Sequence, residues 1–165
     1  MRSEPGYWGG QIAHIGVAIL AVGLAFTGSL VVKTHVEISP GDTVQFVGFD
    51  VTYVNAFNRV EANRFVSGAL MEVSRDGKVL VDLQPRLNSY SNGRDSVGTP
   101  DVYSTLRGDL YFSLRSSVDQ SPIAMDVFWF PDIWLVWLGG LLAGIGGIWA
   151  WIARKPVRKT IAASA

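Results

Sequence analysis

The sequence contains no cysteine, and this absence removes several kinds of chemistry at once. Without thiols the chain has no disulfide bond, no thiolate metal site, no iron–sulfur cluster of its own and no cysteine nucleophile. A domain of this chain in an oxidising compartment must therefore be stabilised by its own apolar core. The stretch 33–132, about a hundred residues, is long enough to form one modest core.

The sequence also lacks an excess of positive charge, which argues against nucleic acid as a partner. The whole chain carries 14 basic and 14 acidic residues, and residues 33–132 contain nine Lys or Arg against thirteen Asp or Glu. A nucleic-acid surface needs a basic patch. The sequence contains no phosphate-binding glycine loop with its Lys and Ser or Thr, no His-x-x-x-His pair and no nucleophile–base arrangement. We therefore expect no catalytic residue in this chain.

What the chain does have is two long apolar runs, at residues 8–32 and 130–153. As a helix the first run would be about 37 Å long, enough to cross a hydrocarbon core of about 30 Å. A cleaved signal peptide is the alternative for this run, but its apolar part is normally shorter, about 7–15 residues. Arg2 precedes the first run, and four cations follow the second: Arg154, Lys155, Arg158 and Lys159. The positive-inside rule then predicts cytoplasmic termini and an extracytoplasmic centre.

These observations predict a multi-pass membrane protein with four segments. A first transmembrane helix with a short cytoplasmic N-terminus occupies 1–33, and an extracytoplasmic β-domain occupies 34–129. A second transmembrane helix follows at 130–153, and a basic cytoplasmic tail at 154–165.

The central region is predicted to be all-β. Alternating apolar and polar residues, rich in β-branched and aromatic types, predict strands at 43–47, 49–54, 65–74, 78–83, 109–115 and 123–129. Asp76-Gly77 between two of these runs predicts a tight hairpin. Residues 84–105 are rich in Gly, Pro, Ser and Asn, and we expect a long loop there. The predicted fold is two transmembrane helices flanking a small β-sandwich or partly open barrel.

His14 is the one titratable side chain in the interior of the two apolar runs. An ionisable group at membrane depth is costly, so it is a functional candidate by default. On a helix it shares a stripe of small residues, which allows another helix or a flat cofactor to approach closely: Gly10, Ala18, Ala21, Ala25 and Gly28.

Three roles for His14 remain open from the residues alone. The imidazole could form an interhelical hydrogen bond, relay a proton, or bind a metal such as haem iron through Nε2. In the last case its other nitrogen would donate to a carbonyl or to a side chain such as Gln11. One histidine cannot supply both axial ligands of a haem, so a second ligand would come from another chain or a second copy.

Other candidates are weaker. His35, just outside the first run, is most simply a surface residue. Gly140 and Gly144 form a GxxxG pattern that favours close helix packing with a membrane partner. Asp101 and Asp109 stand at a loop-to-strand boundary, where carboxylates usually form turns.

An ordered set of motifs resembles the C-terminal end of the CcmF family of cytochrome c maturation haem lyases. The motifs are WGGQIAHIGVAILAVG, ISPGDTV, VSRDGKVLVDLQPRLNSY, RGDLYFSL and IWLVWLGGLLAGIGG. In that family a histidine-bearing span leads to a periplasmic β-domain and then a last span. The resemblance therefore implies that this chain lies in the inner (cytoplasmic) membrane and that its β-domain, 34–129, is periplasmic. The resemblance covers essentially the whole chain.

The resemblance implies a role in covalent attachment of haem to apocytochrome c. It implies that His14 binds the iron of an intramembrane haem b as an axial ligand, and that this haem is shared with a partner chain. The implied partners are the N-terminal part of the haem lyase on another chain, a periplasmic haem chaperone, apocytochrome c with its thiol-handling partner, and membrane lipid. The chain would not be catalytic alone.

The departures from the family are also informative. The family's tryptophan-rich periplasmic segment, its external histidines and its other membrane histidine have no counterpart here, and the R-D-L-Y motif is interrupted at Gly108. We therefore expect a split-gene subunit or a fragment of a larger protein. The alternative function is a non-catalytic two-span scaffold whose β-domain recruits a partner, with His14 only packing helices. A proton-conducting subunit would need further membrane carboxylates or histidines, and ranks last.

Overall fold

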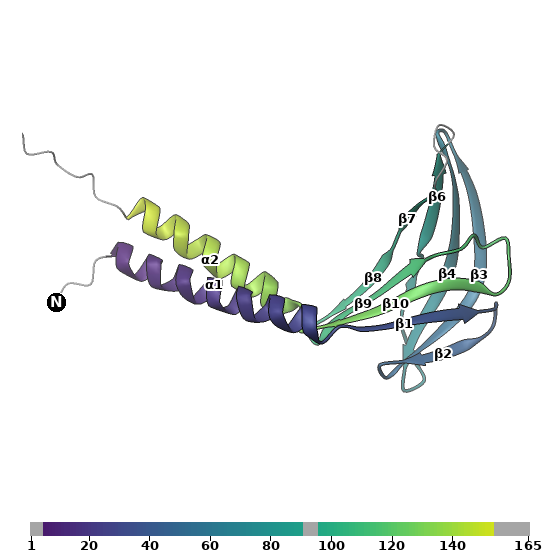
Figure 1. Cartoon of the computed structure of the whole chain (residues 1–165), viewed down its shortest axis with the longest axis horizontal. Helices are drawn as coiled ribbons and strands as arrows, with labels where there is room; N and C mark the ends of the chain where they lie inside the picture. Colours follow the sequence, from purple (N-terminus) through teal and green to yellow (C-terminus); the bar gives the residue numbers. More distant parts are fainter. Residues whose placement is uncertain (1–4, 91–95, 154–165) are drawn as a thin grey trace, which may run out of the picture. The chain divides into compact units, whose positions relative to one another are not determined.

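The chain forms two compact units (Figure 1). The computed structural model describes residues 5–90 and 96–153. One unit contains the helices α1 (Pro5–Ser29) and α2 (Trp134–Ile152). The other, Thr27–Asp132, contains the ten strands found in the described residues.

Helices α1 and α2 pack against each other as an antiparallel pair through glycines. Gly9, Gly16 and Gly23 are the buried residues of α1, and each lies against the backbone of α2. Their spacing of seven keeps them on one face of the helix. On α2, Gly139 and Gly146 have the same spacing and are buried against α1. A Cβ at any of these five positions would collide with the facing helix, so the seam depends on the absence of side chains.

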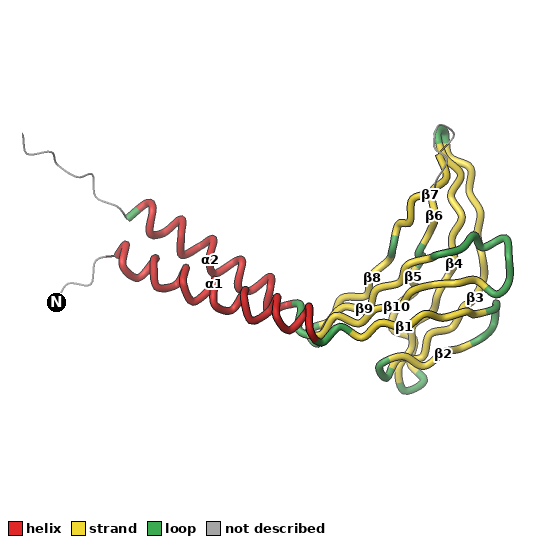
Figure 2. Tube along the Cα trace, in the orientation of Figure 1, coloured by secondary structure: helices red, strands yellow, loops and turns green. Residues whose placement is uncertain are grey.

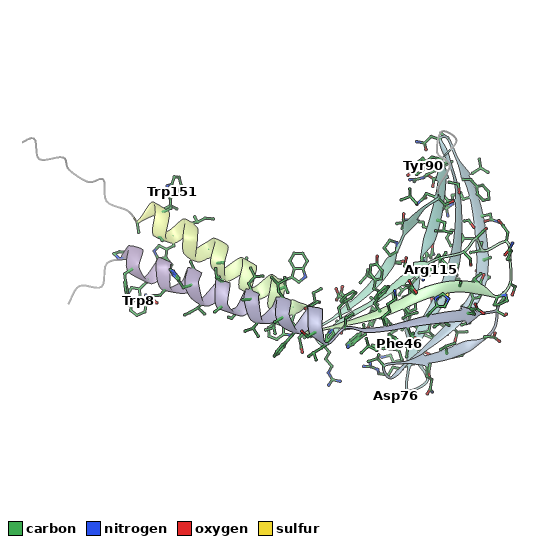
Figure 3. The ribbon with its side chains drawn as sticks, in the orientation of Figure 1. Trp8, Phe46, Asp76, Tyr90, Arg115 and Trp151 are labelled. Atoms are coloured by element: carbon green, nitrogen blue, oxygen red, sulfur yellow. The ribbon has the colours of Figure 1, made fainter. Side chains whose placement is uncertain are left out.

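Both helices are long and apolar enough to span a membrane. Their 25 and 19 residues correspond to about 37 and 28 Å of helix. Neither contains an Asp, Glu, Lys or Arg. Trp8 and Trp151 lie at the same end of the pair (Figure 3), where indole rings commonly anchor helices at a membrane surface.

The second unit is a β-sandwich, which confirms the predicted fold. Sheet A has four strands in the order β1-β10-β9-β8. Sheet B has the order β2-β3-β4-β6-β7, with β5 also paired to β4, and it curls strongly (Figure 1). The bounds in sheet A are β1 Val32–Ile38, β8 Asp101–Thr105, β9 Gly108–Leu114 and β10 Ile123–Pro131. Those in sheet B are β2 Thr43–Phe46, β3 Phe49–Glu61, β4 Arg64–Arg75, β5 Lys78–Leu83, β6 Arg86–Tyr90 and β7 Ser96–Thr99.

The core lies between the two sheets and is built by alternate residues of the central strands. In β9 the pattern is strict, with Leu110, Phe112 and Leu114 buried and the residues between them half-exposed. Phe49 and Tyr53 supply the largest buried rings from sheet B. Burying one such side chain contributes about 1.5–3 kcal/mol, and this core stabilises the domain without disulfides.

Two tight turns in sheet B use residues with positive φ. Asp76 and Gly77 have φ values of 52° and 74° and join β4 to β5, which confirms the predicted hairpin. Val47 and Gly48, with φ values of 50° and 75°, join β2 to β3 in the same way. A β-branched residue is rarely found in this left-handed region, so Val47 stores strain.

The prediction of a long loop at 84–105 is wrong. Outside the undescribed residues 91–95, this stretch forms β6, β7 and β8, which appear as strands in Figure 2. The three strands have only four or five residues each. Because they are short, polar and flanked by Pro85 and Pro100, their composition resembles that of a loop. Their pairing partners, β4 and β9, supply the stabilisation that the local sequence does not show.

Candidate functional site

His14 lies in the first half of α1, and among the described residues only one of its two imidazole nitrogens has a hydrogen-bond partner. Nδ1 is 2.7 Å from the carbonyl oxygen of Gly10, one turn earlier. A carbonyl only accepts hydrogen bonds, so Nδ1 carries a proton, and in the neutral imidazole Nε2 then has the lone pair. The partner is thus a backbone carbonyl rather than the Gln11 side chain. This arrangement fixes the tautomer that a metal-ligating histidine needs.

The His14 side chain is exposed on the face of α1 that points away from α2. At 3.6 residues per turn, it lies about 160° from the seam residue Gly16. The predicted stripe of small residues is therefore distinct from the seam. At two of its positions, Gly10 and Gly28, a Cβ would meet nothing within 4 Å.

These features fit a haem ligand in chemistry and in space. The free Nε2 can bind iron, and the small side chains around it leave room for a flat macrocycle. Within the described residues, no group of three or more His, Asp or Glu could hold a metal ion, so His14 would be a single ligand from this chain. The glycines of the predicted GxxxG, Gly140 and Gly144, are also free of contacts and do not form the seam with α1.

A second polar site lies on the outward face of sheet A, around Asp126. Its carboxylate, only 12% exposed, faces three basic side chains. Oδ1 lies 3.2 Å from Nδ1 of His35, and Oδ2 lies 3.4 Å from Nζ of Lys33 and 3.6 Å from Nη1 of Arg115. Arg115 is labelled in Figure 3. Desolvation alone would raise the pKa of Asp126, but the His35 hydrogen bond and the charges of Arg115 and Lys33 outweigh it and lower that pKa.

Three aromatic rings stand beside this cluster on the same face of sheet A. Phe128 and Phe130 stack with centroids 5.9 Å apart, and Tyr111 meets both edge-on at 5.5 and 6.2 Å. Lys33 joins the two groups, because its Nζ also lies 4.9 Å from the centroid of Phe128. We call Tyr111, Phe128 and Phe130 the aromatic patch.

Sequence reasoning missed the role of His35, which it treated as a simple surface residue. His35 and Asp126 are paired by the register of β1 and β10 although 91 positions separate them. The available signal was Asp126 itself, an acidic residue within an otherwise apolar strand. Asp101 and Asp109, expected to form turns, lie in β8 and β9 instead. The carboxylate of Asp101 accepts hydrogen bonds from the backbone N–H groups of Val102 and of Gln84, which is 17 positions away.

Comparison with known proteins finds one consistent relationship. The family model described as the CcmF C-terminal beta-sandwich matches residues 29–131. The cytochrome c-type biogenesis protein CcmF of Pseudomonas aeruginosa is 30% identical over 149 residues, which cover 90% of this chain and 23% of that protein. CcmF of Escherichia coli is 27% identical over 142 residues, covering 86% of this chain and 22% of that protein.

A solved structure agrees in fold. The chain titled cytochrome c heme lyase CcmF superposes with a TM-score of 0.74 at 17% identity, covering 86% of this chain and 24% of that one. The present chain thus spans about a quarter of the length of the relatives it matches.

Proposed function

The chain belongs to the CcmF family, of which it carries the C-terminal β-sandwich, and from that premise we propose that it is the C-terminal membrane part of a cytochrome c haem lyase. The predicted resemblance is thereby confirmed. Family membership and the two apolar helices support a membrane location. The proposed topology places the sandwich outside the cytoplasmic membrane, because the cations next to the two apolar runs lie on their outer flanks: Arg2 before the first, and Arg154, Lys155, Arg158 and Lys159 after the second.

His14 carries the more specific part of the proposal, as an axial ligand of an intramembrane b-type haem. The supporting observation is the hydrogen bond from Nδ1 to the Gly10 carbonyl, which leaves Nε2 of an exposed side chain as the nitrogen that can bind iron. When bound, haem would supply one-electron redox chemistry. This chain's part is to hold one axial position with a neutral, oriented imidazole.

The face of α1 on which His14 lies indicates which helices would supply the second axial ligand and the other walls of the haem site. Because the side chain faces away from α2, the second ligand and the other walls belong to helices outside this pair. The free glycines Gly140 and Gly144 on α2 offer a further surface for such helices.

The sandwich is proposed to dock apocytochrome c or another maturation protein through the outward face of sheet A. The aromatic patch supports this, because clustered aromatic side chains beside charged ones are typical of interface centres. Lys33, His35 and Arg115 around Asp126 would hold that face rigid while remaining about half-exposed to a partner.

The two histidines provide a matched test of the ligand assignment. The chain is co-expressed with the remaining part of the lyase, and the complex is purified with each histidine replaced in turn. His14→Ala is expected to abolish the low-spin b-type spectrum and most haem measured as the pyridine haemochrome. His35→Ala is expected to leave both intact. Unchanged haem in His14→Ala would reject the ligand role and favour the scaffold function.

A further inference from the structure

The two sheets of the sandwich leave a groove between them at one end. It opens where β3 begins and β4 ends in sheet B, and where β8 and β10 lie in sheet A. Its volume is about 360 Å³, within the range of small-molecule sites. We call it the mouth groove, and its main lining residues are Phe49, Arg75, Tyr103, Leu106, Arg107 and Trp129.

The wall of the mouth groove is aromatic. Phe49 packs edge-on against Tyr103, with 6.2 Å between the ring centroids, and at a tilt of 50° against Trp129, with 5.7 Å between the centroids. Phe49 is buried, whereas Tyr103 and Trp129 are half-buried and present part of their rings to the groove. At the rim, the apolar Leu106 is 87% exposed. Such a wall favours a flat, apolar ligand face.

Two guanidinium groups add positive charge to this wall. The Cζ atom of Arg75 lies 3.8 Å from the centroid of Phe49, and its Nε donates to the Gly48 carbonyl at 3.1 Å. Arg107 follows Leu106 on the turn between β8 and β9. Within the described residues neither arginine lies within 4 Å of a carboxylate, unlike Lys33, Arg64 and Arg115.

The backbone around both arginines is fixed. The hydroxyl of Thr105 donates to the Gly108 carbonyl at 2.7 Å and accepts from the Arg107 N–H at 3.2 Å. The Asp132 N–H donates to the Arg107 carbonyl. On the other side, the strained residue Val47 sets the turn that presents the Gly48 carbonyl to Arg75. The site is therefore built in advance of any ligand, which lowers the cost of binding.

We propose that the mouth groove binds the propionate edge of a tetrapyrrole, with the carboxylates on Arg75 and Arg107 and the macrocycle against Trp129 and Tyr103. The inference rests on the proposed haem lyase function for its choice of ligand. A planar aromatic dicarboxylate matches both halves of the groove, since guanidinium binds carboxylate in a planar fork and aromatic rings stack on a flat face. A phosphate headgroup would use the charges but leave the aromatic wall without a partner.

The test uses metal-free protoporphyrin IX with the full chain in lipid nanodiscs. Without a metal the probe cannot be ligated by His14, and the difference in binding between wild type and the arginine variants reports on the groove, because partition into lipid is the same for both. Arg107→Gln is expected to weaken binding about tenfold, as loss of one charge-assisted hydrogen bond predicts. Arg59→Gln, an exposed arginine on β3 outside the groove, is the matched control. The readout is the shift of the porphyrin absorption and fluorescence bands.

Three further arms keep the proposal falsifiable. His14→Ala should bind the probe like the wild type, so failure of the haem-ligand role leaves this result unaffected. The dimethyl ester of the porphyrin, which lacks both carboxylates, should bind equally to wild type and Arg107→Gln. Arg75→Lys, which keeps the charge but not the planar fork, should weaken binding by less than Arg75→Gln.

Either of two results would overturn the proposal. The first is equal protoporphyrin binding by wild type, Arg107→Gln and Arg75→Gln, with unchanged thermal unfolding. The second is that both arginine variants no longer bind vesicles rich in anionic lipid but still bind porphyrin as the wild type does. The occupant of the groove would then be a phosphate headgroup.

Discussion

The helical unit and the sandwich each hold one conspicuous polar residue, and they satisfy it in opposite ways. Asp126 in the sandwich faces the cations Lys33 and Arg115 and the imidazole of His35, so its carboxylate has partners on both oxygens. His14 in the helices has a single partner, its own backbone, and keeps one ring nitrogen free. A fully satisfied group stabilises the fold, whereas a half-satisfied group in a membrane is available to a ligand. The comparison predicts that Asp126 acts on stability and His14 on haem.

The two units also differ in how they pack, and this difference predicts the largest effect on stability. The sandwich interlocks large side chains, whereas the helix seam has none. Gly16→Leu should therefore destabilise the helix pair by about 3 kcal/mol, because backbone rather than side chain must move. Helical circular dichroism of the purified chain during denaturant titration measures this.

Gly144→Leu is the matched control for the seam. It lies on α2 with nothing within 4 Å of its Cβ position and should leave the unfolding of the isolated chain almost unchanged. Equal destabilisation by both variants would mean that the helices do not pack through the heptad of glycines.

The second-largest expected effect is a loss of stability of the sandwich on replacement of Asp126. Asp126→Asn should destabilise the sandwich by about 1–2 kcal/mol at pH 7, a modest loss because the three basic partner side chains are about half-exposed. Tryptophan fluorescence during urea unfolding measures the loss. The haem content of the co-expressed complex should not change, and a loss of haem in a folded Asp126→Asn complex would break the comparison with His14.

The same carboxylate makes a pH prediction. Its pKa is lowered in the folded state, so its contribution is present above the unfolded pKa of about 3.9 and is lost as pH falls through the folded value. Asp119, whose pKa is lowered by hydrogen bonds from Ser117 and Asn58, acts in the same window. Wild type should thus lose more stability than Asp126→Asn between about pH 5 and pH 2. Parallel stability curves for the two proteins would contradict this assignment.

The smallest expected effect is an increase in the stability of the sandwich. Val47→Asn should stabilise the sandwich by about 1 kcal/mol, because asparagine tolerates the positive φ that strains valine. Val60→Asn, on the exposed and extended part of β3, is the control and should not stabilise. Thermal unfolding of both variants provides the measurement.

Local patterns were enough to predict much of this fold. The apolar runs predicted the two helices, and alternation with Asp76-Gly77 predicted the β4–β5 hairpin. They failed for β6, β7 and β8, which are too short and polar to be recognised without the partner strands. The seam between the helices was not predicted. The motif that can be recognised in α2 is the GxxxG of Gly140 and Gly144, whereas the residues that pack against α1 are Gly139 and Gly146, seven positions apart.

The residues of the candidate sites also differ in whether local sequence predicts them. The position of His14 is a local property of an apolar run, and so sequence alone identified it. The Asp126 cluster and the mouth groove join strands that are far apart in the chain, such as β1 with β10 and β4 with β8. Only the sheet registers bring those residues together, and no local pattern encodes them.

Chemical rescue tests the central claim most directly. In the co-expressed complex, His14→Gly would leave a cavity where the imidazole binds iron, and free imidazole can fill it. We expect that the low-spin b-type spectrum is lost in this variant and returns when imidazole is added. A spectrum that survives without imidazole, or one that imidazole does not restore although haem remains bound, would contradict the assignment of His14 as the axial ligand.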